Sequence, residues 1–279
     1  MNRTTLISVA ELQALQAAGT ALVLLDCSFD LADTGAGARA YAAGHLPGAA
    51  YAHLDADLSG TKTGRNGRHP LPAREAFAAT AGRWGITPGV QVVSYDAQGA
   101  PYASRAWWLL RWLGHDAVAV LDGGLAAWLA AGGTLSTVAP TTPPQPPYPA
   151  LAPAMPTVDA EGLLARLDAV QVLDARNAER YRGEVEPLDA VAGRIPGATL
   201  RFFKDNLGPD GRFKPAAQLR TEFEALGVPA RPVVQQCGSG VTACHNLLAM
   251  AHAGLGLSAL YPGSWSEWCS DPQRPVARG

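Results

Sequence analysis

Residues 232–248 of this chain read Pro-Val-Val-Gln-Gln-Cys-Gly-Ser-Gly-Val-Thr-Ala-Cys-His-Asn-Leu-Leu. The apolar opening, bounded by Pro232, predicts the end of a short buried strand, and the two closing leucines predict one apolar side of a helix. Cys237 therefore stands where a strand ends and a helix is about to begin.

The turn after Cys237 has the composition of a loop that holds a sulfur anion. Gly238 and Gly240 allow backbone conformations closed to residues with a β-carbon, so the N–H groups of the loop, with those of Val241 and Thr242, can turn toward the sulfur. The N-terminus of the expected helix adds partial positive charge at the same point. A cysteine that served only in packing would gain nothing from this arrangement. We therefore predict that Cys237 is a nucleophile.

The residue six positions after the cysteine argues against phosphate chemistry. A cysteine phosphatase needs an arginine there to clamp the phosphate oxygens, and this chain has Ala243. The loop also carries no lysine or arginine of its own. A singly charged persulfide, in which a second sulfur is bonded to the cysteine, suits a ring of N–H groups better than a phosphate dianion does.

The loop from Cys237 to Cys244 resembles the active-site loop of two-domain rhodanese-like sulfurtransferases, in the version found in 3-mercaptopyruvate sulfurtransferases. Thiosulfate-using relatives usually carry basic residues at the positions of Gly238 and Ser239. Further motifs of the family follow in order: Leu-Asp-Ala-Arg at 173–176, Arg-Tyr at 180–181, Gly-Arg-Ile-Pro-Gly-Ala at 193–198 and Gly-Ser-Trp-Ser-Glu-Trp at 263–268. The resemblance covers essentially the whole chain. It implies an α/β fold of two tandem rhodanese-like domains, each a parallel sheet flanked by helices.

The pattern of apolar residues agrees with that fold. Short apolar segments alternate with helical patterns, which predicts parallel sheets covered on both faces; the strands are expected at 21–25, 90–94 and 118–121, and the helices at 8–18, 102–113 and 125–131. Prolines crowd residues 137–156, as in an extended linker. We expect a catalytically silent rhodanese-like domain at residues 1–137, a proline-rich linker at 138–157 and a catalytic rhodanese-like domain at 158–279.

The second half of the chain repeats the first. Asp26 matches Asp174, and a Gly-His-Leu-Pro-Gly-Ala turn matches the Gly-Arg-Ile-Pro-Gly-Ala turn of the second half. Extending this alignment places Asp96 opposite Cys237. An aspartate cannot carry sulfane sulfur, so the first half is predicted to be a tandem-repeat copy without catalytic activity.

Two arginines follow the strand that ends at Asp174. The carboxyl ends of parallel strands meet at one edge of the sheet, so Arg176 and Arg180 are expected near Cys237. The resemblance implies that Arg180 grips the substrate anion, and Arg176 is a second candidate for substrate binding. Pairing with Asp174 or Glu179 is the plainer alternative for either arginine.

One departure from the family pattern affects the choice of substrate. Mercaptopyruvate enzymes often continue with Glu-Pro-Arg, whereas Glu186 and its proline are followed here by Leu188. Arg194, which replaces the histidine of the usual turn, is a candidate to restore that positive charge.

The resemblance also implies a catalytic relay. Asp55 and His69 align with family residues proposed to form, with the loop serine Ser239, an arrangement like a Ser-His-Asp triad. Such a relay either polarises the ketone or delivers a proton while the C–S bond breaks. The plainer alternative for His69 is a solvated turn on a polar loop.

The composition excludes several other classes of function. The chain of 279 residues has 22 Lys and Arg against 24 Asp and Glu, which favours neither nucleic acid nor an anionic membrane as a partner. Four cysteines in a chain of this length do not make a disulfide framework, and their spacing fits no zinc clip. The first 25 residues lack a long apolar run leading to a cleavage site. We expect a cytoplasmic protein with no metal and no organic cofactor.

The sequence therefore predicts a sulfurtransferase that moves sulfane sulfur from 3-mercaptopyruvate through a Cys237 persulfide to a thiol or cyanide. The partners are then a small-molecule sulfur donor and acceptor, with a thioredoxin-like protein as a candidate acceptor. Two alternatives stay open: a thiosulfate:cyanide sulfurtransferase, and a persulfide-binding or anion-binding module without catalysis.

Overall fold

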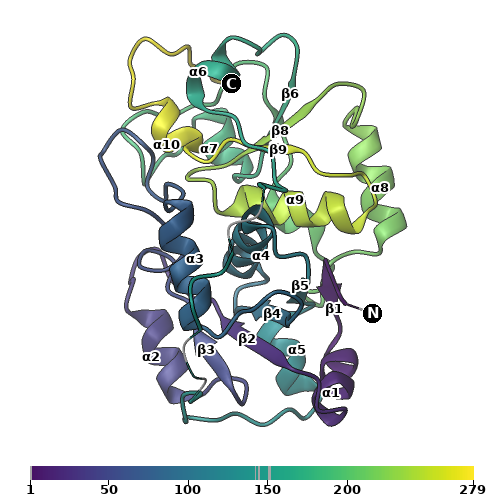
Figure 1. The fold of residues 1–279 in the computed structure, drawn as a ribbon. Coiled ribbons are helices and arrows are strands. Elements are labelled where there is room, and N and C mark those ends of the chain that lie inside the picture. The colour runs from purple at the N-terminus through teal and green to yellow at the C-terminus, as the bar shows by residue number, and fades with distance from the viewer. Residues whose placement is uncertain (1, 142, 144, 150–151) are drawn as a thin grey trace. The chain divides into compact units, whose positions relative to one another are not determined.

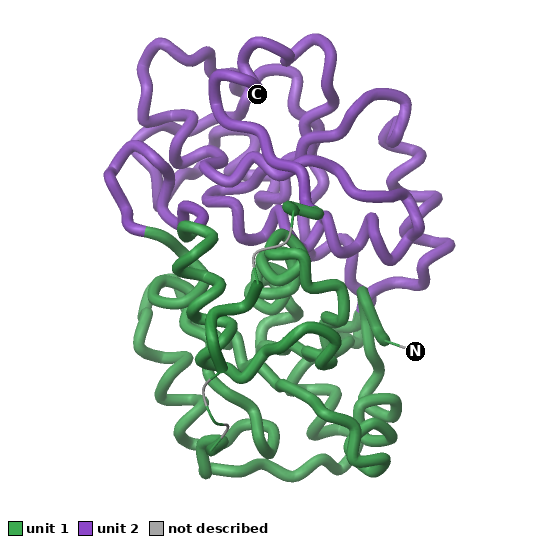
Figure 2. Tube along the Cα trace, in the orientation of Figure 1, with its two compact units in different colours: residues 1–60, 72–154, 209–212 green, residues 61–71, 155–208, 213–279 purple. Residues whose placement is uncertain are grey.

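The computed structural model describes residues 2–141, 143, 145–149 and 152–279 (Figure 1). The chain divides by its contacts into two compact units, one of residues 1–60, 72–154 and 209–212 and the other of residues 61–71, 155–208 and 213–279 (Figure 2). Each unit contains a parallel sheet connected by helices, which is the α/β architecture that the sequence predicts.

The sheet of the first unit has the strand order β1-β5-β4-β2-β3, and all its pairs are parallel. Its strands are β1 (Leu6–Ile7), β2 (Leu22–Asp26), β3 (Ala49–Tyr51), β4 (Gln91–Tyr95) and β5 (Val118–Leu121). Its helices are α1 (Val9–Ala17), α2 (Ala36–Ala43), α3 (Arg74–Arg83), α4 (Pro101–Leu113) and α5 (Gly124–Ala130). Leu24, Val93 and Trp128 lie in its apolar core. Every residue of the central strand β4 is buried, as expected for a parallel strand with both faces covered.

The sheet of the second unit has the order β7-β6-β8-β9, again with parallel pairs. Its strands are β6 (Gln171–Asp174), β7 (Thr199–Leu200), β8 (Val233–Gln236) and β9 (Ala259–Leu260). Its helices are α6 (Ala160–Leu164), α7 (Ala178–Arg182), the 3-10 helix η1 (Phe203–Asn206), α8 (Ala216–Ala225), α9 (Thr242–His252) and α10 (Ser264–Trp268). Helices α8 and α9 pack side by side (Figure 1). Val172, Val234 and Trp265 contribute to the core of this unit.

The local signals in the sequence place these elements within one or two residues. The strands expected at 21–25, 90–94 and 118–121 are β2, β4 and β5. Ser8 caps α1 with a capping box, since its hydroxyl accepts from the N–H of Glu11 and the Glu11 carboxylate accepts from the N–H of Ser8.

The compact units are not continuous in sequence, unlike the predicted domains. Residues 61–71 lie in the first half of the chain but group with the second unit. The Arg68 N–H donates to the Ser266 hydroxyl at 3.1 Å, and Gly67 lies against the backbone of Gly263. These contacts join positions almost 200 residues apart, beyond the reach of any local pattern.

The predicted linker is divided between the two units: residues 145–149 pack against the first unit, and from Met155 onward it belongs to the second, where the Pro156 carbonyl accepts the N–H of Leu260 at 3.0 Å. Residues 142, 144, 150 and 151 of this linker lie outside the described residues. Between them, the Gln145 N–H donates to the carbonyl of Gly82, the Tyr148 N–H donates to that of Ala78, and the Tyr148 side chain is buried.

In the described part of the chain, every helix falls short of the length and apolar character that a membrane span requires.

The turn between β4 and α4 is organised around a buried carboxylate. Asp96 follows β4, and its Oδ1 accepts the N–H groups of Gln98 at 2.9 Å and Ala100 at 2.8 Å. Its Oδ2 accepts those of Tyr102 and Ala103, both at 2.9 Å. The residue is 1% exposed. Four backbone donors thus converge on one anion at the carboxyl end of the sheet.

Replacing Asp96 is expected to destabilise the protein strongly. Asp96→Asn turns one acceptor oxygen into an amide donor that faces two N–H groups, and buried unsatisfied donors cost about 1–3 kcal/mol each. We expect a loss of about 3 kcal/mol in the free energy of unfolding, measured in urea. Asp116→Asn is the control, because Asp116 is exposed and makes only a long ion pair with Arg111. Equal losses in both variants would contradict this account of the turn.

Candidate active site

Cys237 lies directly after β8 and five residues before the first residue of α9. The side chain is buried, and its Sγ accepts the N–H of Gly240 at 3.1 Å. The backbone of Cys237 is also held, because its N–H donates to the Ser264 hydroxyl at 3.1 Å and its carbonyl accepts the N–H of Trp265 at 3.0 Å. The sulfur therefore has a fixed position at the end of the central strand and the start of an 11-residue helix.

The two glycines of the loop are required for different reasons. Gly240 has a φ of +77°, and a β-carbon there would lie 2.2 Å from the carbonyl oxygen of Pro262. Gly238 does not adopt a left-handed conformation, so the prediction that it is needed for backbone freedom is wrong. A β-carbon at Gly238 would instead lie 2.9 Å from Nη2 of Arg68 and 3.2 Å from Nη1 of Arg180. Gly238 makes room for two guanidinium groups.

Several N–H groups after Cys237 have no acceptor in the protein. Among the described residues, none accepts a hydrogen bond from the N–H of Ser239, Val241, Thr242 or Ala243. In the repeat, Ser239, Val241 and Ala243 match three of the residues whose N–H groups bind the Asp96 carboxylate, namely Gln98, Ala100 and Tyr102. The loop of the first unit thus contains the anion that the loop of the second unit is arranged to receive.

Arg176 is held by groups of the protein itself. Its Nη2 donates to Asp174 Oδ2 at 2.7 Å and to the carbonyl of Gly193 at 2.8 Å, and its guanidinium lies 4.9 Å from the ring centre of Trp265. Burial alone would lower the pKa of Arg176, but the carboxylates of Asp174 and Glu186 outweigh burial and raise it. Arg176 is 3% exposed, and its predicted contact with substrate stays a prediction.

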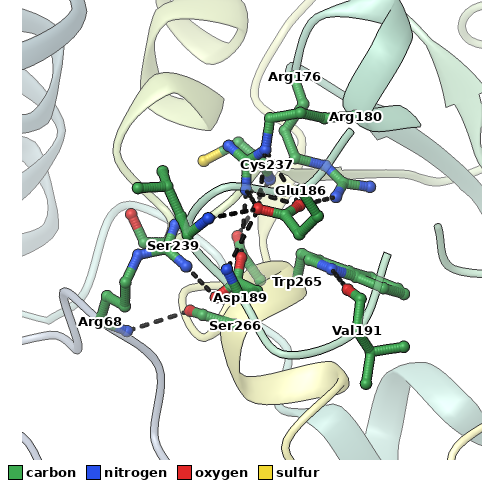
Figure 3. A network of polar contacts seen from close by, with 12 residues as sticks. Arg68, Arg176, Arg180, Glu186, Asp189, Val191, Cys237, Ser239, Trp265 and Ser266 are labelled. Atoms are coloured by element: carbon green, nitrogen blue, oxygen red, sulfur yellow. Dashed lines mark hydrogen bonds and ion pairs between the residues drawn. The ribbon is translucent and has the colours of Figure 1, made fainter. Parts of the chain in front are cut away.

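Arg180 is bound on one side by two carboxylates. Its Nε and Nη2 form a fork with Glu186, at distances between 2.7 and 3.2 Å, and Nη2 also donates to Asp189 at 3.1 Å. Arg68 forms an ion pair with the other oxygen of Asp189, as Figure 3 shows. The carboxylates of Glu186 and Asp189 are almost fully buried.

His69 and Ser239 lie in direct contact. The distance between His69 Nδ1 and Ser239 Oγ is 2.7 Å, and both side chains are buried. The structure thus brings together two of the three residues of the predicted relay. Asp55 belongs to the first unit, and its part in the relay stays a prediction.

The sequence did not predict Arg68 or Asp189 as residues of the site. Arg68 stands among other charged residues on a polar loop, and its only signal is that it precedes His69. Arg194, predicted to replace a missing charge, donates instead to the carbonyl of Gly279 at 2.6 Å and lies over the Tyr181 ring. Among the described residues, no contact of Arg194 with the Cys237 loop is present.

The chain matches the family model of the rhodanese-like domain twice, at residues 8–131 and 159–271. It is 50% identical over 264 residues to the "Probable 3-mercaptopyruvate sulfurtransferase" of Pseudomonas aeruginosa, covering 92% of this chain and 93% of that protein. It is 34% identical over 275 residues to the thiosulfate sulfurtransferase of Bos taurus, covering 94% of this chain and 90% of that protein. The solved structure of the 3-mercaptopyruvate sulfurtransferase from Leishmania major superposes with a TM-score of 0.85 at 29% identity, covering 98% of this chain and 76% of that one.

Gly240→Ala is expected to disrupt the loop, because the new methyl group would collide with backbone that cannot move independently. Gly256→Ala is the matched control: Gly256 has a φ of +80° but open space around it, so its replacement carries only the cost of the left-handed conformation, about 1–2 kcal/mol. Gly240→Ala should lose clearly more stability in urea and should change the rate at which Cys237 reacts with iodoacetamide. Similar effects of the two substitutions would show that Pro262 does not restrict position 240.

Proposed function

The chain belongs to the rhodanese-like family, and we propose that it is a 3-mercaptopyruvate sulfurtransferase that works through a persulfide on Cys237. The observation that carries this proposal is the set of unpaired N–H groups after Cys237, whose counterparts in the first unit bind an anion. A persulfide is an anion of the right charge for such a ring, and it forms on a sulfur that already accepts the N–H of Gly240.

The reaction runs in two halves. The Cys237 thiolate attacks the sulfur of 3-mercaptopyruvate, the S–C bond breaks, and its electron pair leaves with the enolate of pyruvate, which takes up a proton. A thiol or cyanide then attacks the outer sulfur of the persulfide and releases the Cys237 thiolate. Every electron pair and proton is accounted for without a metal or an organic cofactor.

The first unit takes no sulfur in this proposal. Asp96 fills the place of the nucleophile with a carboxyl group, and three of its four hydrogen bonds use donors whose counterparts after Cys237 are open. The silent domain keeps a turn whose N–H groups bind an anion, but it has an aspartate in place of the cysteine that would carry sulfur.

Cys237→Ser should abolish sulfur transfer with every donor, because a serine hydroxyl is not ionised and cannot carry sulfane sulfur. Intact mass after incubation with donor alone should show one added sulfur atom in the wild-type protein, removed by cyanide and absent from Cys237→Ser. Cys269→Ser is the control and should still gain the sulfur. If Cys244 carried the added sulfur instead, Cys237 would not be the nucleophile. A wild-type protein that is inactive with all donors would favour an anion-binding module.

The contact between His69 and Ser239 fits the delivery of the proton that the enolate needs. With thiosulfate the leaving group is sulfite, which needs no proton on carbon. Ser239→Ala should therefore lower kcat with 3-mercaptopyruvate by about 100-fold, in the range of lost general acid catalysis, and lower kcat with thiosulfate much less. Ser270→Ala is the exposed control. Equal losses with both donors would mean that the pair shapes the loop rather than transferring a proton.

The thiosulfate alternative keeps support, since several relatives of this chain are named thiosulfate sulfurtransferases, two of them at 41% identity. Steady-state rates with both donors side by side decide between them. The four cysteines are free, and a persulfide on Cys237 survives best in a reducing compartment, so we place the protein in the cytoplasm with a thioredoxin-like protein as one candidate acceptor.

A further inference from the structure

Two guanidinium groups converge on one point beside the candidate nucleophile. Nη2 of Arg68 and Nη1 of Arg180 lie 2.9 and 3.2 Å from the position that a β-carbon of Gly238 would occupy. Among the described residues, neither nitrogen has a hydrogen-bond acceptor. Each arginine therefore keeps a free Nη donor, and both of these donors lie over the residue that follows Cys237.

Asp189 holds the two arginines in this arrangement. One of its oxygens pairs with Nη1 of Arg68, and the other accepts from Nη2 of Arg180 (Figure 3). The Asp189 N–H donates to Glu186 at 3.2 Å, so Asp189 is itself fixed to the carboxylate that accepts hydrogen bonds from Arg180. Asp189 thus orients both guanidinium groups and cancels one of their two charges.

We propose that Arg68 binds the donor together with Arg180, and that Asp189 is a positioning residue which makes their shared site fit a singly charged carboxylate. This inference deepens the proposed function and rests on it. Consecutive α-carbons are about 3.8 Å apart, so a carboxylate held over Gly238 keeps a sulfur two carbons away within reach of Cys237. A 2-oxo carboxylate with a thiol on its third carbon has that spacing.

The balance of charge supports a monoanion over a dianion. Three guanidinium groups lie beside the loop, on Arg68, Arg176 and Arg180, and three carboxylates pair with them. Those carboxylates belong to Asp174, Glu186 and Asp189. Because the cluster as a whole is already neutral, the donor is held by free N–H groups rather than by net charge, and each negative charge it brings into this half-buried site is uncompensated. Thiosulfate brings two such charges and a monocarboxylate brings one.

The first test measures binding without turnover. Pyruvate, a monoanion with the carboxylate and ketone of the donor, serves as the probe in calorimetric titrations. Arg68→Gln should raise the Kd for pyruvate about tenfold, the effect of one lost charge-assisted hydrogen bond. Arg65→Gln is the matched control, since Arg65 lies exposed on the same loop and loses the same charge. An unchanged Kd in Arg68→Gln, with an unchanged melting temperature, would overturn the inference whatever the activity of the enzyme.

The second test measures donor choice. Asp189→Asn removes one negative charge beside both free nitrogens, so it should raise the ratio of thiosulfate to 3-mercaptopyruvate kcat/KM about tenfold. Glu184→Gln removes the same charge from an exposed pair with Arg182 and should leave the ratio unchanged. Arg68→Gln should raise KM for 3-mercaptopyruvate with little change in kcat. A ratio that does not move in Asp189→Asn contradicts the role given to Asp189.

The two tests separate failure of this inference from failure of the proposed function. A wild-type protein without sulfurtransferase activity, but whose binding of pyruvate depends on Arg68, would refute the proposed function and uphold the carboxylate site. An active enzyme whose KM and affinity for pyruvate do not depend on Arg68 would refute the carboxylate site and uphold the proposed function.

Discussion

The structure depends on the need to satisfy backbone N–H groups at the turn between the central strand and the following helix. Buried donors without an acceptor are costly, so a turn that aims several of them at one point needs an anion there. In the first unit the chain supplies that anion itself, as the Asp96 carboxylate. In the second unit it supplies a thiol, and the remaining N–H groups stay open for a second sulfur. The two halves of the duplication differ in whether the chain itself supplies the acceptor for these N–H groups.

The same contrast extends to the neighbouring strand. Asp174, at the end of β6, is neutralised by Arg176, whose guanidinium also reaches the carboxylate of Glu186. The matching aspartate of the first unit, Asp26, is followed two residues later by Ser28, so no arginine reaches from there to the first turn. The second unit therefore combines open N–H groups after Cys237 with guanidinium groups beside the same loop. At the matching positions of the first unit, Asp96 takes up the donors and position 28 is a serine.

Local signals in the sequence predicted the elements and the position of Cys237 between a strand and a helix, because a buried strand, a proline boundary and a glycine turn all act within a few residues. The capping box at Ser8 is such a signal, and so is the junction at Cys237. The sequence could not show that residues 61–71 pack with the second unit, since the contact of His69 with Ser239 spans 170 positions. Arg68 was missed for the same reason. The resemblance to a family recovered His69, whereas pattern alone gave it no more weight than a solvated turn.

The structural reason for a glycine at position 238 bears on the choice of sulfur donor. The absence of basic side chains in residues 237–244 suggested a neutral site, yet the structure brings two guanidinium groups over that loop from Arg68 and Arg180. A β-carbon at position 238 would lie 2.9 and 3.2 Å from these guanidinium nitrogens and would have to displace them. A basic residue at 238, usual in the thiosulfate-using relatives, would occupy the space that these arginines fill. A basic side chain at position 238 and the guanidinium groups of Arg68 and Arg180 therefore compete for the same space. A basic loop residue brings its charge unpaired, whereas Arg68 and Arg180 bring theirs already shared with Asp189. Donor choice then follows from whether the cation beside the nucleophile has a carboxylate partner, and not from how many cations the site contains.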